Sequence, residues 1–231
     1  AAYYTLSPST LELLRGHTVD IFTVDAGLAF YYGIRWHPRP IFQSYSAYTN
    51  YLDSLNQRFL KRPDAPEFLL YAPVEFDQKS AVFFEPATYR EMLTGYRAVA
   101  KDGEFWVLKK KEAVTDALQQ DADAVTAPLG ARIPFSIDDR YFVFARVYVK
   151  YNIMGRAIRV LYRAPNIYIQ FYRGGVPNKR YKFCFNAVNG IYLNPFADNA
   201  APWAANEFAI ITPYPAFFDK AISVEFFRIL K

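Results

Sequence analysis

The chain has one cysteine, two histidines and no long uninterrupted apolar run. The single Cys184 excludes an internal disulfide framework, and its apolar context YKFCFNA predicts a small buried thiol rather than a reactive one. With only His17 and His37, the chain has little material for a zinc site, and we expect neither metal nor cofactor. The apolar runs are shorter than the roughly 18 residues that a membrane-spanning helix needs, so we expect no bilayer-crossing segment here.

Catalytic signatures are missing as well. The sequence contains no G-x-S-x-G motif, no glycine-rich phosphate loop and no cysteine pair. His37 lies between Trp36 and Pro38, and nothing in the sequence identifies a partner for acid–base work. We therefore expect that this chain is not an enzyme on its own. A net charge of +5 without a recognised motif does not indicate nucleic acid either.

The composition predicts a well-packed protein. Of 231 residues, 52% are hydrophobic, which is enough to bury a core in one large domain or two small ones. Aromatic residues make up 19%, and tyrosine suits binding surfaces because it has an apolar ring and a polar hydroxyl. The chain opens with AAYYTL, without an initiator methionine or a signal peptide, so we expect a segment of a longer or processed protein.

Residues 1–115 alternate helix-like and strand-like segments, which predicts an α/β domain. Ser9 followed by Glu12 fits a capping box at the first helix, and residues 18–22 fit a short buried strand. Thr49 can cap a helix that begins near Asn50. Another helix can begin at a proline, Pro86, and an Asp-Gly pair at 102–103 between two apolar runs predicts a hairpin.

Residues 120–231 read as an all-β antiparallel sandwich of the jelly-roll or carbohydrate-binding-module kind. Helical periodicity ends near residue 125, and glycine, proline and asparagine separate short strand-like runs. The polar segment 111–125 is the predicted join between the domains. The predicted strands are 131–137, 140–151, 156–164, 166–173, 180–187, 207–214 and 222–230.

Four carboxylates support an alternative function, a glycoside-cleaving hydrolase. Asp20 lies in the first buried strand, Asp25 starts the next helix, and Glu75 and Asp77 follow the second strand. Ligands favour the crevice beyond the carboxyl ends of such strands, and two carboxylates can act as acid and base. The structural interpretation is favoured, because Asp25 suits a first helical turn and Asp20 can accept backbone hydrogen bonds.

A basic and aromatic stretch gives the clearest functional signal. Residues 140–182 contain ten Lys or Arg and no Asp or Glu. Strand alternation puts Val143, Ala145 and Val147 on one face, and Phe142, Phe144, Arg146 and Tyr148 on the other. In the run 166–173 the same alternation groups Tyr168 and Tyr172. Rings beside hydrogen-bonding cations suit a glycan or an anionic envelope component, although Tyr and Arg also pack across ordinary exposed strands. The candidate ligand-binding residues here are Arg146, Tyr148, Tyr168 and Tyr172.

A second candidate site is the stretch RWHPRPIFQSYSAYT, residues 35–49. Its prolines hold the backbone extended before the helix, but helix initiation does not need the polar side chains between them. We expect these to form a polar network that either holds a ligand or fixes the interdomain join, with the structural role favoured. The residues of this network are Arg39, Gln43, Ser44, Tyr45 and Tyr48.

The stretch PRPIFQSYSAYTNYLDSLNQRFL, with APEFLLY and GEFWVLKKK, resembles the soluble C-terminal part of large multi-spanning bacterial membrane proteins. Some of these look like membrane glycosyltransferases that use lipid-linked sugars. The resemblance implies a membrane-embedded region elsewhere in the same protein and an extracytoplasmic location, periplasmic or at the cell surface. It brings no catalytic residue. The matching residues are Arg39, Pro40, Gln43, Ser44, Tyr45, Ala47, Tyr48, Thr49, Leu52 and Asn56; a proline often follows the threonine in that pattern, where this chain has Asn50.

Together these observations predict a binding or accessory ectodomain that recognises a glycan or an anionic envelope component. The alternatives are the hydrolase above and an assembly module whose exposed aromatic residues dock a partner protein.

Overall fold

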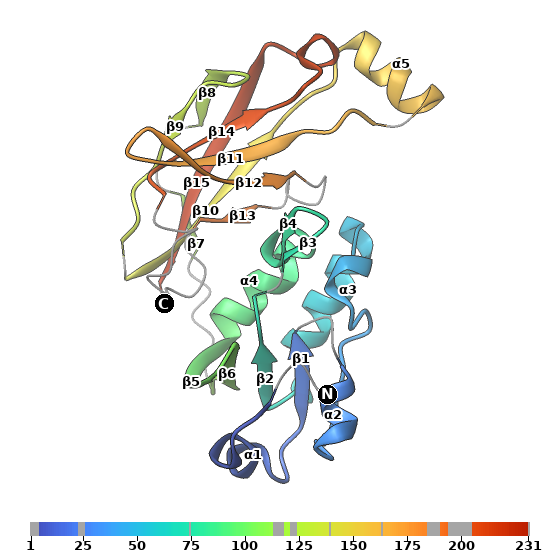
Figure 1. The fold of residues 1–231 in the computed structure, drawn as a ribbon, viewed down its shortest axis with the longest axis vertical. Coiled ribbons are helices and arrows are strands. Elements are labelled where there is room, and N and C mark those ends of the chain that lie inside the picture. Colours follow the sequence, from blue (N-terminus) through green and yellow to red (C-terminus); the bar gives the residue numbers. More distant parts are fainter. Residues whose placement is uncertain are drawn as a thin grey trace. The chain divides into compact units, whose positions relative to one another are not determined.

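The computed structural model describes residues 5–22, 26–73, 75–112, 118–120, 124–138, 140–162, 164–183, 190–193 and 205–230 (Figure 1). The chain divides into two compact units. Unit 1 comprises Ala1–Phe76 and Phe84–Asp116, and unit 2 comprises Asp77–Phe83 and Ala117–Lys231. A short segment of unit 2 is thus inserted within the sequence of unit 1. Among the described residues, no helix is both long and apolar enough to cross a membrane.

Unit 1 contains a mixed four-stranded sheet in the order β1-β2-β6-β5. Strand β1 (Val19–Phe22) runs parallel to β2 (Phe68–Tyr71), whereas β6 (Phe105–Lys110) is antiparallel to both β2 and β5 (Tyr96–Asp102). Every residue of β1 and β2 is buried, as expected for short strands covered on both faces. The predicted hairpin is confirmed: β5 and β6 are joined at Gly103, whose φ of 56° is the left-handed conformation that glycine adopts without strain.

The helices of unit 1 begin mostly where the sequence predicts. Thr49 caps α3 (Asn50–Lys61) by accepting a hydrogen bond from the amide of Leu52, and α4 (Pro86–Gly95) begins at its proline. The predicted cap of α1 (Pro8–Leu14) is wrong, because Ser7 and not Ser9 accepts the capping hydrogen bond. A proline suits the first helical position, so the helix begins at Pro8 and the preceding serine becomes the cap. The remaining elements are α2 (Gly27–Tyr31), η1 (Ser44–Ser46) and β3 (Glu75–Phe76).

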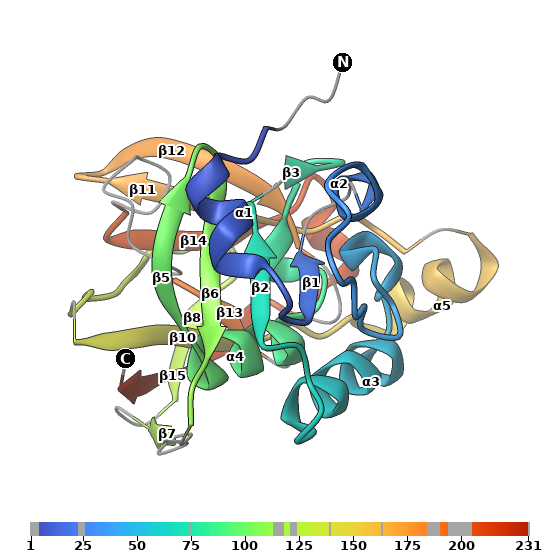
Figure 2. The same ribbon diagram turned by 90° about the horizontal axis from the view of Figure 1, so that it is seen from below.

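The two faces of the unit 1 sheet differ in what they contact. Helix α1 lies across one face (Figure 2), where Leu14 packs with Val19, Ile21 and other core residues. Side chains alternate along a strand, so Asp20 and Phe22 point to the opposite face. There the ring of Phe22 meets Tyr89 of α4 edge-on at 6.0 Å. A carboxylate in the middle of a buried strand therefore faces the helical layer rather than solvent.

Unit 2 is built mainly from two antiparallel sheets, in the orders β13-β10-β15-β7, with β8 also pairing β15, and β12-β11-β14-β9. The ring centroids of Phe208 on β14 and Phe226 on β15 are 6.4 Å apart, so side chains of the two sheets are in contact. The strands are β7 (Leu118–Gln120), β8 (Val125–Pro128), β9 (Ile133–Pro134), β10 (Tyr141–Tyr148), β11 (Tyr168–Arg173), β12 (Val176–Lys182), β13 (Ile191–Tyr192), β14 (Glu207–Ile211) and β15 (Ala221–Leu230). The shorter elements are β4 (Lys79–Ser80), η2 (Ala81–Phe83) and η4 (Pro215–Phe217).

Three predictions for this half of the chain are wrong. The run 156–164 is not a strand, because α5 (Ile153–Leu161) occupies it. The predicted join includes 118–120, which form β7 on the edge of β15. On β10, Phe142 and Phe144 are both buried, so the second face of this strand is exposed only around Arg146 and Tyr148. The environment predicted for Cys184 lies outside the described residues.

Candidate functional site

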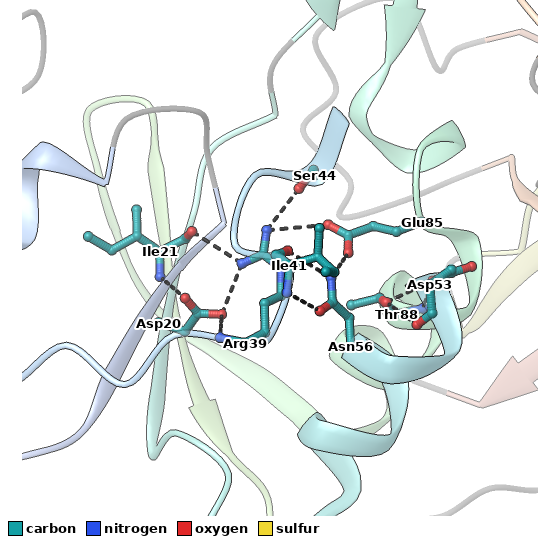
Figure 3. A network of polar contacts seen from close by, with 9 residues as sticks. All are labelled: Asp20, Ile21, Arg39, Ile41, Ser44, Asp53, Asn56, Glu85 and Thr88. Atoms are coloured by element: carbon teal, nitrogen blue, oxygen red, sulfur yellow. Dashed lines mark hydrogen bonds and ion pairs between the residues drawn. The ribbon is translucent and has the colours of Figure 1, made fainter. Parts of the chain in front are cut away.

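The side chain of Arg39, in the stretch 35–49, is fully buried (Figure 3). Its Nη1 donates to Oδ2 of Asp20 at 2.9 Å and to the carbonyl of Ile21 at 3.3 Å. The guanidinium carbon lies 3.6 Å from the centroid of the Phe22 ring, a cation–π contact. Arg39 thus bonds the segment to strand β1.

The other side of the guanidinium reaches the helical layer. Nη2 of Arg39 donates to Oγ of Ser44 at 2.9 Å and to Oε1 of Glu85 at 3.3 Å. Asn56 of α3 donates to the second oxygen of Glu85 at 2.7 Å, and it also bonds both backbone polar groups of Ile41. Burial alone lowers the pKa of Arg39, but the carboxylates of Glu85 and Asp20 outweigh it and raise that pKa.

Asp53 of α3 extends this network to the start of α4. Its two carboxylate oxygens accept from the amides of Ala87 and Thr88, at 3.0 and 2.9 Å, and Oδ1 also accepts from the Thr88 hydroxyl at 2.7 Å. The helix's own N-cap residue, Glu85, makes no capping hydrogen bond, so a side chain from α3 does this instead. Burial raises the pKa of Asp53 to about 6, although these hydrogen bonds favour its charged form.

We call Asp20, Arg39, Ser44, Asp53, Asn56, Glu85 and Thr88 the buried polar network. Asp20, Asp53, Asn56, Glu85 and Thr88 each have a relative exposure of 0%. A substrate therefore has no access to these groups in this structure. Their bonds tie the segment 35–49 to β1, α3 and α4, which is a structural function.

The other residues predicted near this segment lie elsewhere. Gln43 and Tyr45 are half-buried, whereas Tyr48 is 72% exposed and does not join the buried polar network. Asp77, in unit 2, is exposed and lies 3.7 Å from the ammonium of Lys182. Glu75 is exposed on β3, and Asp25 lies outside the described residues. Neither Glu75 nor Asp77 lies in the buried polar network beside Asp20.

Unit 1 also carries a cationic pocket of about 450 Å³ at the β5–β6 edge. Arg97 of β5 and Lys109 of β6 are directly opposite in the antiparallel register, which places two like charges side by side. Burial lowers the pKa of Lys110 and of Lys111 beside them. The pocket is lined by Arg97, Lys109, Lys110, Lys111 and Glu112.

In unit 2, Tyr168 and Tyr172 share one face of β11 with Gln170, as predicted, while Ile169 and Phe171 are buried on the other. Each tyrosine is half-buried and carries a guanidinium over its ring. Arg180 of β12 lies 5.2 Å from the centroid of Tyr168, and Arg132 lies 4.5 Å from that of Tyr172. Lys182 is the cross-strand neighbour of Tyr168. We call this surface the β11 outer face: Arg132, Tyr168, Gln170, Tyr172, Arg180 and Lys182.

The remaining predicted residues, Arg146 and Tyr148, belong to β10 in the other sheet. The guanidinium of Arg146 lies 4.6 Å from the centroid of Phe227, and the Tyr148 hydroxyl donates to Glu225 at 3.2 Å. Both side chains therefore already have partners on β15. The four ligand residues that the sequence predicts in this unit therefore form two groups on different sheets, while those of the stretch 35–49 belong to unit 1.

Sequence reasoning missed the residues that complete each group. Glu85 precedes a helix-initiating proline like any loop acid, and Arg132 sits in a short strand-like run without an acidic or basic neighbour. Strand register pairs Arg180 with Gln170, a signal that only the hairpin geometry reveals. Within the described residues, no cluster of His, Cys, Asp and Glu has the makeup of a metal site. Comparison with protein-family models, with curated proteins and with solved structures gave no match to this chain.

Proposed function

We propose that this chain is an extracytoplasmic binding domain of a membrane-attached protein and that it recognises an acidic polysaccharide of the cell envelope on the β11 outer face. The observation that carries the proposal is the pairing of each tyrosine of this face with an arginine. The resemblance to membrane-protein ectodomains supports the location. Under this proposal, unit 1 is an α/β domain, and the two main sheets of unit 2 form a sandwich of the jelly-roll or carbohydrate-binding-module kind.

The geometry favours the anionic group of a glycan over its neutral sugar ring. The guanidinium groups cover the tyrosine rings, so these rings offer little flat surface for a sugar to stack on. A stacked guanidinium keeps its N–H groups at its edge, where they can bind a carboxylate or sulfate in bidentate fashion. Arg132 and Arg180 are both exposed, and Arg132 lies 4.0 Å from the carboxylate of Glu207, at the limit of an ion pair.

The hydrolase alternative has less support. Asp20 is fully buried and bonded to Arg39, so it cannot act on a bound glycan. Asp77 is held near two lysines, Lys79 and Lys182, at 3.5 and 3.7 Å. The ion-pair partners of Asp77 among the described residues are thus cations, whereas glycoside cleavage requires a second carboxylate facing the first.

The test is binding of polygalacturonate, with neutral dextran as the uncharged comparison, at low and high salt. We expect binding of the acidic polymer alone, weakening as salt rises because exposed charges are screened over about 8 Å at physiological ionic strength. Arg132→Ala and Arg180→Ala should each weaken binding by about tenfold, the effect of losing one charge-assisted contact. Arg58→Ala is the matched control, since Arg58 is an exposed arginine of α3.

Binding that is insensitive to salt, or that Arg58→Ala weakens as much as Arg180→Ala does, contradicts the proposal. Binding of dextran with the same affinity as polygalacturonate would show that the ligand is a neutral glycan and not an anionic one. No binding of either polymer leaves the assembly module as the favoured alternative.

A further inference from the structure

Helix α5 is held to the rest of unit 2 along one side only. Asn152 caps it by accepting from the amide of Gly155 and also donates to the carbonyls of Ala216 and Phe218, at 2.8 and 3.3 Å. A Cβ atom placed on Gly155 would lie 1.9 Å from the carbonyl oxygen of Phe217. Only a glycine permits this approach of helix to backbone, so α5 has one fixed side.

The free side of α5 is apolar and exposed. Ile153 and Val160 are each 81% exposed, Leu161 is 72% exposed and Met154 is 57% exposed. At 100° per residue these four side chains, together with Ala157, fall on one continuous arc of the helix. Tyr162, directly after the helix, is 78% exposed. Gly155 is the only residue of the helix that is buried.

Such an apolar face needs an occupant, since exposed clusters of large apolar side chains mark interaction sites. Arg156 and Arg159 border the arc on the side toward Gly155, as the helical spacing requires. No acidic residue occurs anywhere in 140–182. The charged side chains of α5 and of its neighbours along 140–182 are therefore all basic, which complements an anionic surface.

We propose that α5 is an interfacial helix whose apolar face enters the headgroup layer of an anionic lipid bilayer. Within unit 2 the helix projects beyond the two sheets in both ribbon views (Figures 1 and 2). A projecting convex face fits a planar, deformable bilayer, whereas docking onto a protein requires a complementary groove. Amphipathic helices with arginine at the polar border bind membranes in this way, with the axis parallel to the surface.

This inference goes beyond the proposed function and does not depend on it, because α5 and the β11 outer face share no residue. The helix is short, so its contact with the bilayer is weak; attachment of the same protein to the membrane would add to this contact but is not required for it. A protein anchored elsewhere would be oriented by α5 rather than held by it.

The experiment is co-sedimentation of the full chain with lipid vesicles, either of phosphatidylcholine alone or with about one part phosphatidylglycerol in four. We expect binding to the anionic vesicles and at least about tenfold weaker binding after Val160→Asp, because that change puts a charge into the apolar arc. Arg156→Gln with Arg159→Gln should remove the preference for anionic lipid. A Tyr162→Trp variant should show blue-shifted emission when vesicles are added.

The matched control is Val176→Asp, which introduces the same charge at another exposed valine of unit 2, 65% exposed in the β11–β12 hairpin. This variant should bind like the parent. The proposal is overturned if the parent does not bind anionic vesicles or if Val160→Asp binds as well as the parent. A concentration-dependent dimer that Val160→Asp abolishes, without vesicle binding, identifies a second copy of the chain as the occupant instead. Vesicle binding lost only in Arg132→Ala and Arg180→Ala would move the lipid contact to the β11 outer face.

Discussion

The buried polar network places one cation among several acids away from solvent. Nη1 of Arg39 bonds Asp20 and the carbonyl of Ile21. Nη2 bonds Glu85 and the hydroxyl of Ser44. Burying a charge costs free energy, and an opposite charge offsets that cost only when it is well placed. Removing one member of the network therefore leaves the remaining charges buried without a partner. This network is therefore a sensitive point of the fold.

Arg39→Met should lower the free energy of unfolding by about 3–5 kcal/mol, because Asp20 and Glu85 then remain buried without their cation. Urea unfolding measures the change. Arg58→Met is the control, since an exposed arginine should contribute less than about 0.5 kcal/mol. An equal effect of the two substitutions would show that the buried charges are not what stabilises this region.

Asp53 should make stability depend on pH. Burial raises its pKa from 3.8 to about 6 in the folded protein, so the folded state binds the proton more tightly than the unfolded state does. The stabilisation that results is fully present below about pH 4 and is lost as pH rises through 6. Relative to Asp53→Asn, which cannot titrate, the wild type should lose up to about 3 kcal/mol between pH 4 and 7. Urea unfolding at several pH values measures this; parallel curves for the two proteins would contradict it.

The sequence predicted part of this network. Arg39 and Ser44 were expected to form polar contacts, and Asp20 was recognised as a carboxylate in a buried strand that can accept backbone hydrogen bonds. The pairing itself was not predictable, because it joins residues 19 and 46 positions apart through chain packing. Glu85 and Asp53 also resemble ordinary loop and first-turn acids until their partners are known.

At the level of elements, we expect like charges to destabilise the β5–β6 pair. Arg97 and Lys109 are opposite one another, and within the described part of the chain neither has a carboxylate partner within 4 Å. Lys109→Glu should convert this repulsion into a cross-strand ion pair and raise the free energy of unfolding by about 0.5 kcal/mol. Thermal unfolding at low salt measures the gain, which high salt should reduce. A loss of stability would show that repulsion between Arg97 and Lys109 does not destabilise this pair of strands.

Element prediction succeeded where local chemistry decides the structure. Thr49 and Pro86 fix the starts of α3 and α4 through capping and ring geometry, which act within a few residues. It failed at α5, because the branched residues of RAIRVLYRA favour a strand on propensity alone. The decisive signals were Asn152 as a cap and an apolar repeat that begins at Ile153, and both precede the run read as a strand.

At the level of the whole molecule, the boundary near residue 116 lies inside the predicted join, but the insertion of Asp77–Phe83 had no signal in the sequence. The amide of Lys182 donates to the carbonyl of Gln78 at 2.8 Å, and Phe83 packs on Tyr181 with ring centroids 5.5 Å apart. These are contacts between residues about 100 positions apart, which local patterns cannot specify.

Because of this insertion, one cut at the boundary leaves the segment Asp77–Phe83 of unit 2 on the fragment that carries unit 1. We expect that a protease nick between 112 and 118 leaves a complex that runs as one species in gel filtration under native conditions and separates into two fragments in denaturant. A matched nick in the β11–β12 hairpin tests whether cutting alone causes dissociation. Two separate native species after the first nick would contradict the division of the chain.

The insertion also sets an order of events during synthesis. Residues 77–83 leave the ribosome about 100 residues before Tyr181, an interval of about 5–20 s at ordinary rates of translation. During this time unit 1 can fold, whereas the ring of Phe83 cannot yet pack on Tyr181, which has not been synthesised. Unit 2 is therefore completed only when Tyr181 and Lys182 emerge and pair with a segment made about 100 residues earlier.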